Sequence, residues 1–220
     1  MERSAKPSVN FIEKNWHGKP YYSLDAYCKN TYGEKLYKVA LDAGMTCPNR
    51  DGTKSGRGCI FCSAGGSGDF AVSLKEGDAF ERGIAALSGK KTGQRFIAYF
   101  QAYTNTYGPI SYLEKVYRLA LDAALTAGIS IATRPDCLSA PVIELLRKLK
   151  EEYPSKFIWI ELGLQTIHED TAAFIRRGYP LSCFEESVKL LQHAKIPVIV
   201  HVILGLPGED TERMLSTIRY

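Results

Sequence analysis

Three cysteines, Cys47, Cys59 and Cys62, lie close together in the sequence with the spacing C-x11-C-x2-C. The stretch around them, 47–70, is rich in glycine and polar residues, so it is a poor place for thiols that only fill a core. A disulfide takes two cysteines, and a structural zinc ion normally takes four ligands. The set of three therefore indicates a metal centre with one position left for another ligand.

Soft thiolates select zinc, copper(I) or iron–sulfur clusters. Three interpretations of the cysteines are considered: an iron–sulfur cluster, a zinc ion, and cysteines with a structural role only. A cluster usually takes four cysteines, so a cluster held by three leaves one iron open to an exogenous ligand. Zinc would need a further ligand, such as the carboxylate of Asp51 or Asp69, or would keep an open catalytic position. The third interpretation is three buried structural cysteines. The polar, glycine-rich surroundings favour the iron–sulfur cluster.

Composition sets wide limits on the rest of the molecule. The chain has 220 residues, 45% of them hydrophobic and 24% charged, which suits one large domain or two small ones. The net charge of +4 permits a nucleic-acid partner without indicating one. The N-terminus has no apolar signal segment, and the longest apolar run, 197–207, is too short to span a bilayer. We therefore expect a cytoplasmic protein without membrane association, in which Cys28, Cys137 and Cys183 are packing residues.

Apolar, β-branched runs alternate with amphipathic segments along the chain. Strands are expected at 36–41, 96–100, 129–133, 157–164 and 198–204. Helices are expected at 111–125, from 139 to about 154, at 169–177, from 182, and from about 209 onward. Capping boxes, Ser111 with Glu114 and Ser182 with Glu185, are predicted to begin two of them. The pattern predicts an α/β fold with a parallel sheet, either doubly wound or a partial barrel.

The unusual polar stretches all follow a predicted strand. They are the cysteine loop, 101–107, 134–136, 165–166 and the turn at 205–208. Because ligands bind at the carboxyl ends of parallel strands, we expect these stretches to meet in one active site.

The cysteine region resembles the radical S-adenosylmethionine (SAM) superfamily. The segments TCPNRDG, GRGCIFCS and GSGDF, with Phe61 before the last cysteine, resemble its YtqA/YhcC-like subfamily, which is related to the catalytic subunit of Elongator. The long first gap departs from the commonest spacing, C-x3-C-x2-C. The resemblance extends from about Tyr21 to the C-terminus. It implies a [4Fe–4S] cluster on Cys47, Cys59 and Cys62, with SAM on the fourth iron.

The implied chemistry is reductive cleavage of SAM to a 5′-deoxyadenosyl radical, with an electron donor such as flavodoxin or ferredoxin. The resemblance also implies SAM contacts after each strand. Gln101, Ala102, Tyr103 and Thr104 replace the family's glycine-rich loop, which holds the SAM amino group. Ala132 stands where many relatives have a glutamate that faces SAM.

The last two strands carry the remaining implied contacts. Gln165, in the motif ELGLQ, would contact the ribose and carboxylate of SAM, and Arg177 would pair with the carboxylate. His201 would meet the ribose, and the backbones of Gly205 and Phe61 would meet the adenine. Alternatively, Tyr103 is a lid residue, Arg177 stabilises a helix end, and His201 belongs to the core.

The fold class implied is α/β, a partial (β/α) TIM-like barrel of the radical SAM type. Residues 1–33 are expected to form an N-terminal extension with aromatics over the barrel, and 34–220 a core barrel that ends before its last strand. Kinship to Elongator suggests a tRNA wobble uridine as substrate, with Lys90, Lys91, Arg147, Lys148 and Lys150 as candidate phosphate contacts. The alternatives are radical chemistry on a small molecule or protein and a non-catalytic metal-binding scaffold. No catalytic acid, base or hydrogen-relay residue is assigned.

Overall fold

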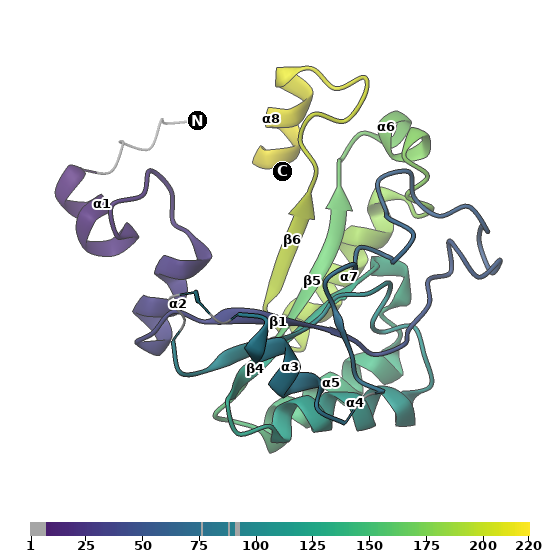
Figure 1. Ribbon diagram of the computed structural model, residues 1–220. Coiled ribbons are helices and arrows are strands. Elements are labelled where there is room, and N and C mark those ends of the chain that lie inside the picture. Colours follow the sequence, from purple (N-terminus) through teal and green to yellow (C-terminus); the bar gives the residue numbers. More distant parts are fainter. Residues whose placement is uncertain (1–7, 76, 88, 91–92) are drawn as a thin grey trace.

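A curved, fully parallel sheet with helices on its convex side forms the body of the protein (Figure 1). The computed structural model describes residues 8–75, 77–87, 89–90 and 93–220. The strand order is β2-β1-β3-β4-β5-β6. The strands are β1 (Tyr37–Asp42), β2 (Val72–Ser73), β3 (Phe96–Phe100), β4 (Thr126–Thr133), β5 (Phe157–Gln165) and β6 (Val198–Val202). The predicted α/β fold of the partial TIM-like barrel type is confirmed.

The five predicted strands are all present, and the structure adds β2 at the edge of the sheet. β2 is two residues long and pairs with the end of β1, Leu41 opposite Val72. Its shortness and its position next to a glycine-rich loop explain why the sequence pattern did not reveal it.

The outer face of the sheet packs against helices and holds the main core. Alternate residues of β1, β3, β4 and β5, such as Leu41, Phe100 and Ile160, are buried there. The helices are α3 (Ala79–Ala85), α4 (Ile110–Asp122), α5 (Ala140–Glu152), α6 (Glu169–Phe174), α7 (Leu181–His193) and α8 (Thr211–Arg219). A short 3₁₀ helix, Pro135–Cys137, follows β4. Burial of each large aliphatic side chain contributes about 1.5–3 kcal/mol.

Two predicted helix starts were wrong in detail. α4 and α7 begin one residue before Ser111 and Ser182, and neither has a side-chain cap. The residue before each helix is a proline, Pro109 or Pro180, so each serine lies inside the first turn instead of at the cap position. α6 also ends at Phe174, earlier than predicted, because the chain then turns through left-handed conformations.

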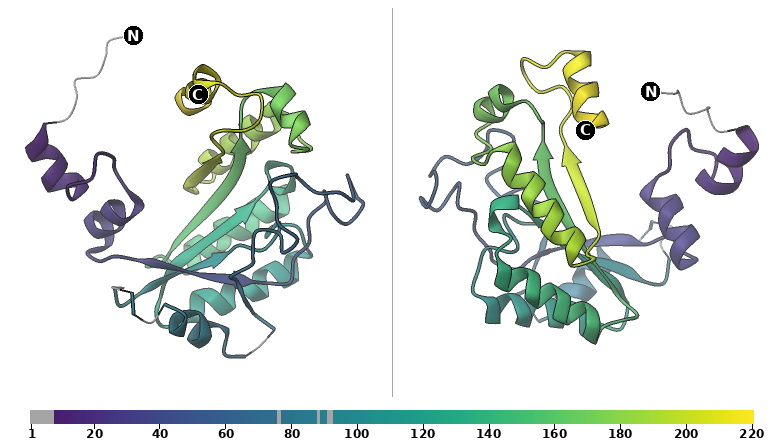
Figure 2. Two further views of the ribbon diagram at one scale, coloured as in Figure 1. Left: turned by 45° about the horizontal axis from the view of Figure 1, so that its top comes forward. Right: turned by 180° about the vertical axis from the view of Figure 1, so that it is seen from behind.

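The N-terminal helices lie at the opposite end of the sheet from the predicted site. α1 (Val9–Trp16) extends away from the sheet (Figure 2). α2 (Leu24–Tyr32) packs on the inner face, where Tyr27 lies 5.9 Å from Trp159 between ring centroids. Cys28 is buried in the same cluster, as expected of a packing residue. The inner face is thus closed at its amino end by an aromatic layer.

Candidate functional site

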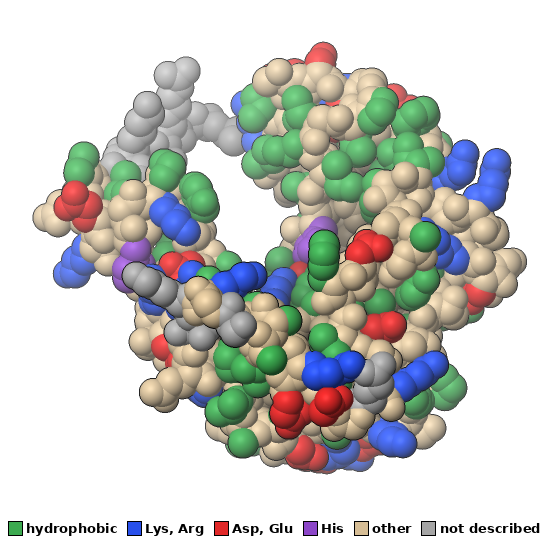
Figure 3. All heavy atoms as spheres, viewed as in Figure 1, with side chains coloured by type: hydrophobic (Ala, Val, Ile, Leu, Met, Phe, Trp, Pro, Cys, Tyr) green, Lys and Arg blue, Asp and Glu red, His purple; other side chains and the backbone are tan. Residues whose placement is uncertain are grey.

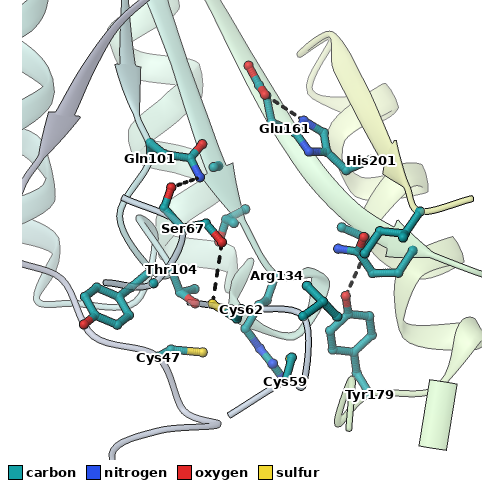
Figure 4. Close-up of a pocket in the computed structure, with 18 of the residues that line it drawn as sticks. Cys47, Cys59, Cys62, Ser67, Gln101, Thr104, Arg134, Glu161, Tyr179 and His201 are labelled. Carbon is teal, nitrogen blue, oxygen red and sulfur yellow. Dashed lines mark hydrogen bonds and ion pairs between the residues drawn. The ribbon is translucent and has the colours of Figure 1, made fainter. Parts of the chain in front are cut away.

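A cavity of about 320 Å³ opens at the carboxyl ends of the strands. Segments that follow β1, β3, β4, β5 and β6 all contribute to its wall, as the sequence predicted. Predicted site residues in the wall are Cys47, Cys59, Phe61, Cys62, Gln101, Tyr103, Thr104, Gln165 and His201. The cysteines lie at one end of the cavity, and Glu161 with His201 lies toward the other (Figure 4).

The three thiols share this wall without forming a single-ion site. Among the described side chains, no group of three His, Cys, Asp or Glu residues is arranged to hold one metal ion. A cluster, in contrast, spreads its thiolates over separate irons, so its ligands need only face a common space. Cys47, Cys59 and Cys62 meet that requirement, and all three are free thiols. Burial raises the pKa of the Cys59 thiol, an effect that a hydrogen bond from Asn49 partly offsets.

The cysteine loop is shaped by side chains that donate to its backbone. The guanidinium of Arg50 donates to the carbonyls of Cys62, at 2.9 Å, and Ser63, at 2.5 Å. The Asn49 amide donates to the Cys59 sulfur at 3.3 Å. Asn49 and Arg50 lie within the stretch 47–70, but their side-chain contacts could not be predicted from the sequence.

The loop after β3 meets the cysteine loop closely. Gln101 donates to the Ser67 carbonyl at 2.9 Å, and the Tyr103 hydroxyl donates to the Ala64 carbonyl at 3.0 Å. A Cβ on Gly66 would lie 2.4 Å from the Tyr103 ring, so the glycine permits this approach. The close packing of the two loops thus depends on glycines of the cysteine loop, Gly66 and Gly68. Ala102 is buried and does not line the cavity, unlike its three neighbours.

Gln165 ends β5 in an unusual backbone conformation. Its φ is 66°, a left-handed value that a non-glycine residue seldom adopts outside sites that need it. Its carbonyl accepts a hydrogen bond from the Ile203 amide at 3.0 Å. The side chain lies in the cavity wall, so the structure brings it to the predicted place.

Arg177 does not lie where the sequence suggested. Its side chain is only 1% exposed and is absent from the cavity wall. The guanidinium donates to the carbonyls of Leu164, at 2.9 Å, and Thr166, at 2.6 Å, on either side of Gln165. Because α6 ends early, the chain turns back and directs Arg177 beneath β5 instead of toward the cavity. The donors of Arg177 are thus directed at protein acceptors and not into the cavity.

A different arginine, Arg134, lines the cavity. It forms two hydrogen bonds of 2.9 Å with Asp136, and Lys54 lies 2.5 Å from the same carboxylate. Burial would raise the pKa of Asp136, but Arg134 and Lys54 together hold it below its usual value. Arg134 also donates to the Arg177 carbonyl at 3.0 Å. Arg134 and Lys54 thus share one carboxylate, which lies outside the cavity wall.

A layer of polar side chains, here called the polar layer, crosses the inner face between the cavity and the aromatic layer. Its members are Lys38, Tyr99, Ser130, Glu161 and His201, from five different strands. Glu161 has a fully buried side chain that contacts Lys38 and Ser130 and lies 2.7 Å from His201 Nε2. Burial would raise the pKa of Glu161, but His201 and Lys38 lower it to about 2.

The polar layer was largely missed by sequence reasoning. Only His201 was proposed as a site residue, with a core role as its alternative. His201 is 45% exposed at its side chain and bonded to a carboxylate, so it is not an apolar core residue. Glu161 pairs in register with Ala132, the position where the family resemblance implies a glutamate. The signal that could have revealed the layer is a single polar residue in the middle of each otherwise apolar strand, at a position whose side chain points to the inner face.

The remaining predicted contacts are divided. Phe61 lines the cavity, but Gly205 does not, and Val202 with Ile203 takes its place in the wall. Gly205 adopts a φ of 80° in the turn after β6. The roles of all these residues toward SAM remain predictions.

Most of the candidate phosphate contacts are already paired. Arg147 bridges to Glu144 and Glu151, Lys148 lies 3.1 Å from Glu114, and Lys150 donates to a backbone carbonyl. Lys90 packs over the Tyr37 ring at 5.9 Å, and Lys91 lies outside the described residues. Their contact with nucleic acid remains a prediction.

A parallel partial barrel with three thiols in the wall of a cavity at its carboxyl end is the fold and site arrangement of a radical SAM protein. The sequence matches the Radical SAM superfamily over residues 51–220, and the chain belongs to that family. Members of this superfamily normally use a [4Fe–4S] cluster and SAM. The first cysteine, Cys47, lies just before the matched region.

Similar proteins agree with the subfamily resemblance. The chain is 43% identical over 201 residues to the uncharacterized protein YtqA of Bacillus subtilis, covering 90% of this chain and 62% of YtqA. It is 36% identical over 190 residues to YhcC of Escherichia coli, covering 85% and 59%. The chain thus spans about three fifths of these relatives. The resemblance to the YtqA/YhcC-like group is confirmed.

Among solved structures, the archaeal Elp3 of Methanocaldococcus infernus with an N-terminal deletion has the same fold. Its TM-score is 0.56 at 18% identity, and the match covers 84% of this chain and 41% of Elp3. Within the described part of the chain, no helix is both long and apolar enough to cross a membrane.

Proposed function

We propose that this protein is a radical SAM enzyme that binds a [4Fe–4S] cluster through Cys47, Cys59 and Cys62. The observation that carries the proposal is the convergence of these thiols with Gln165, Thr104 and His201 on one cavity. When bound, the cluster and SAM supply a 5′-deoxyadenosyl radical that abstracts a hydrogen atom from the substrate. A metal-binding scaffold would need only the thiols, so the other residues of the wall favour an enzyme.

The chain's own residues have distinct tasks in this proposal. The cysteine thiolates hold the cluster, while Arg50 and Tyr103 fix the loops around it. Gln165, the loop 101–104 and Phe61 offer polar groups and backbone to SAM. The polar layer faces the inner end of the cavity, so we assign it to substrate contact rather than cluster binding. The aromatic layer beneath it excludes water from that end.

We also propose tRNA as the substrate class. A stretch of 84 residues is 31% identical to the tRNA uridine(34) acetyltransferase of Methanocaldococcus jannaschii, covering 38% of this chain and 14% of that enzyme. The kinship to Elongator supports the same substrate. Arg147, Lys148 and Lys150 already have protein partners, so the proposal does not use them as phosphate contacts.

Anaerobic reconstitution with iron and sulfide, followed by reduction and EPR, tests the enzyme proposal. We expect a [4Fe–4S]⁺ signal that changes when SAM is added. Cys59→Ala should lose the signal, whereas Cys183→Ala, which removes a thiol outside the cavity wall, should keep it. Stoichiometric zinc in a colourless protein would return the chain to the scaffold class.

Filter binding with bulk tRNA at several salt concentrations tests the substrate class. An RNA-binding protein releases counterions, so its affinity should fall linearly on a log–log plot against salt. Affinity that is absent at low salt would favour a small molecule or a protein as substrate. That result would leave the cluster proposal intact.

A further inference from the structure

Asn49 joins the cysteine loop to the segment 175–178, which precedes Tyr179 in the cavity wall. Its side-chain amide lies 3.3 Å from the Cys59 sulfur, 2.9 Å from the Arg176 carbonyl and 3.1 Å from the Arg177 carbonyl. The residue is almost fully buried. A single amide group is thus surrounded by one sulfur and two carbonyl acceptors.

The three acceptors fix which way the amide points. An amide nitrogen carries two N–H donors, whereas its oxygen only accepts. A flipped Asn49 would direct its oxygen at three other acceptors, which would repel it. In the orientation observed, Asn49 Oδ1 is buried with no hydrogen-bond partner among the described residues. The two N–H donors are therefore shared among the Cys59 sulfur and the two carbonyls, and at least one of them is bifurcated.

The surroundings hold this donor in place. A Cβ at Gly178 would lie 2.6 Å from Asn49 Oδ1, and Gly178 has a φ of 81°, so only glycine suits the position. The Ile60 amide donates to the Ile175 carbonyl at 3.1 Å, and Arg134 donates to the Arg177 carbonyl at 3.0 Å. The segment 175–178 is therefore attached to the cysteine loop at several points. Its geometry does not depend on Asn49 alone.

We propose that Asn49 raises the reduction potential of the cluster through its N–H···S hydrogen bond to Cys59, an inference that rests on the proposed function. One electron from an external one-electron donor reduces the cluster and adds negative charge to it and its ligand sulfurs. A hydrogen-bond donor at such a sulfur stabilises the reduced state more than the oxidised state. Asn49 is a positioning and tuning residue and does not touch SAM or substrate.

The test is an EPR-monitored redox titration of the reconstituted full chain and its Asn49→Leu variant. Leucine has a similar shape and no donor. The matched control is Asn105→Leu, because Asn105 is also buried and donates to two carbonyls, those of Phe100 and Ala132, at 3.1 Å each. Asn105 also has an unpartnered Oδ1, but among the described residues its amide donates only to carbonyls and to no thiol. The two variants differ in the sulfur hydrogen bond.

We expect Asn49→Leu to shift the midpoint potential of the cluster to a more negative value and Asn105→Leu to leave that potential unchanged. Both variants should have lower thermal stability than the parent. Gly178→Ala should shift the potential in the same direction, because its Cβ displaces the Asn49 amide while the amide itself remains. If Asn49→Leu does not assemble a cluster, the redox titration of Gly178→Ala tests the inference instead. Potentials equal to that of the parent in Asn49→Leu or Gly178→Ala would overturn the inference. A parent chain without any cluster would instead end the proposed function.

Discussion

Glu161 is an ionised side chain held inside the inner face by its neighbours. His201 and Lys38 outweigh the effect of burial and lower the pKa of Glu161 from its ordinary 4.5 to about 2. A carboxylate with a lowered pKa stabilises the fold above its unfolded pKa and loses that contribution as pH falls through its folded pKa. The polar layer should therefore add to acid sensitivity between about pH 4.5 and 2.

The first prediction concerns this charge. Glu161→Gln should lower the free energy of unfolding at pH 7 by roughly 3 kcal/mol, because the lowered pKa is a measure of the lost interactions. Its stability should also fall less steeply than that of the parent between pH 4.5 and 2. Urea unfolding at several pH values measures both effects. The control is Glu151→Gln, on an exposed helix face, and an equal loss in the control would contradict the prediction.

Arg177 carries the second prediction at the residue scale. Arg177→Met should lower the free energy of unfolding by about 3 kcal/mol, because the buried carbonyls of Leu164 and Thr166 both lose a charged donor, although the Leu164 carbonyl keeps the Thr166 amide. It should also weaken SAM binding, since those carbonyls flank Gln165. The neighbouring Arg176 is exposed, so Arg176→Met is the matched control. Isothermal titration with SAM on the reconstituted protein, together with urea unfolding, compares the pair. If Arg177→Met bound SAM as tightly as the parent, Arg177 would not be needed to hold Gln165 in its SAM-binding conformation.

At the scale of elements, the strands could be predicted because their apolar runs are long and bounded by glycine and polar residues. The short β2 and the helix starts after Pro109 and Pro180 could not be predicted. A local sequence pattern does not reveal a two-residue strand or fix which residue caps a helix. The convergence of the loops followed from the parallel order of the strands. The polar layer and the burial of Arg177 depend on contacts between distant segments, which no local pattern contains.

The aromatic layer beneath α2 yields the third prediction. Trp159 is nearly fully buried and stacks on Phe157 at 3.9 Å between ring centroids. Trp159→Ala should cost about 3–5 kcal/mol, as is typical for a large buried aromatic residue. Trp16→Ala, in the projecting helix α1, should cost less than 1 kcal/mol. Chemical denaturation followed by circular dichroism makes the comparison. Similar losses in the two variants would show that α1 is as firmly packed as the inner face.

At the scale of the whole molecule, the sheet is open between α2 and α8, and the space-filling view shows a hollow there (Figure 3). The cavity lies on this inner face, and its wall comes from segments after β1, β3, β4, β5 and β6. A ligand that contacts all of these segments connects strands from nearly the full width of the sheet. Its binding should therefore stabilise the molecule as a unit instead of ordering one loop.

This linkage gives the last prediction. SAM at about 100 times its dissociation constant should add about 2.7 kcal/mol to the free energy of unfolding of the reconstituted protein. For a chain of this size the melting temperature should then rise by about 5–10 °C. The rise should vanish in Cys47→Ala, because the proposed SAM site includes the cluster, and persist in Cys183→Ala, because that thiol lies outside the wall. A rise that persists in Cys47→Ala would mean that the wall residues bind SAM without the cluster. The cavity would then be a SAM site in its own right, and Gln165 would carry more of the affinity than the iron.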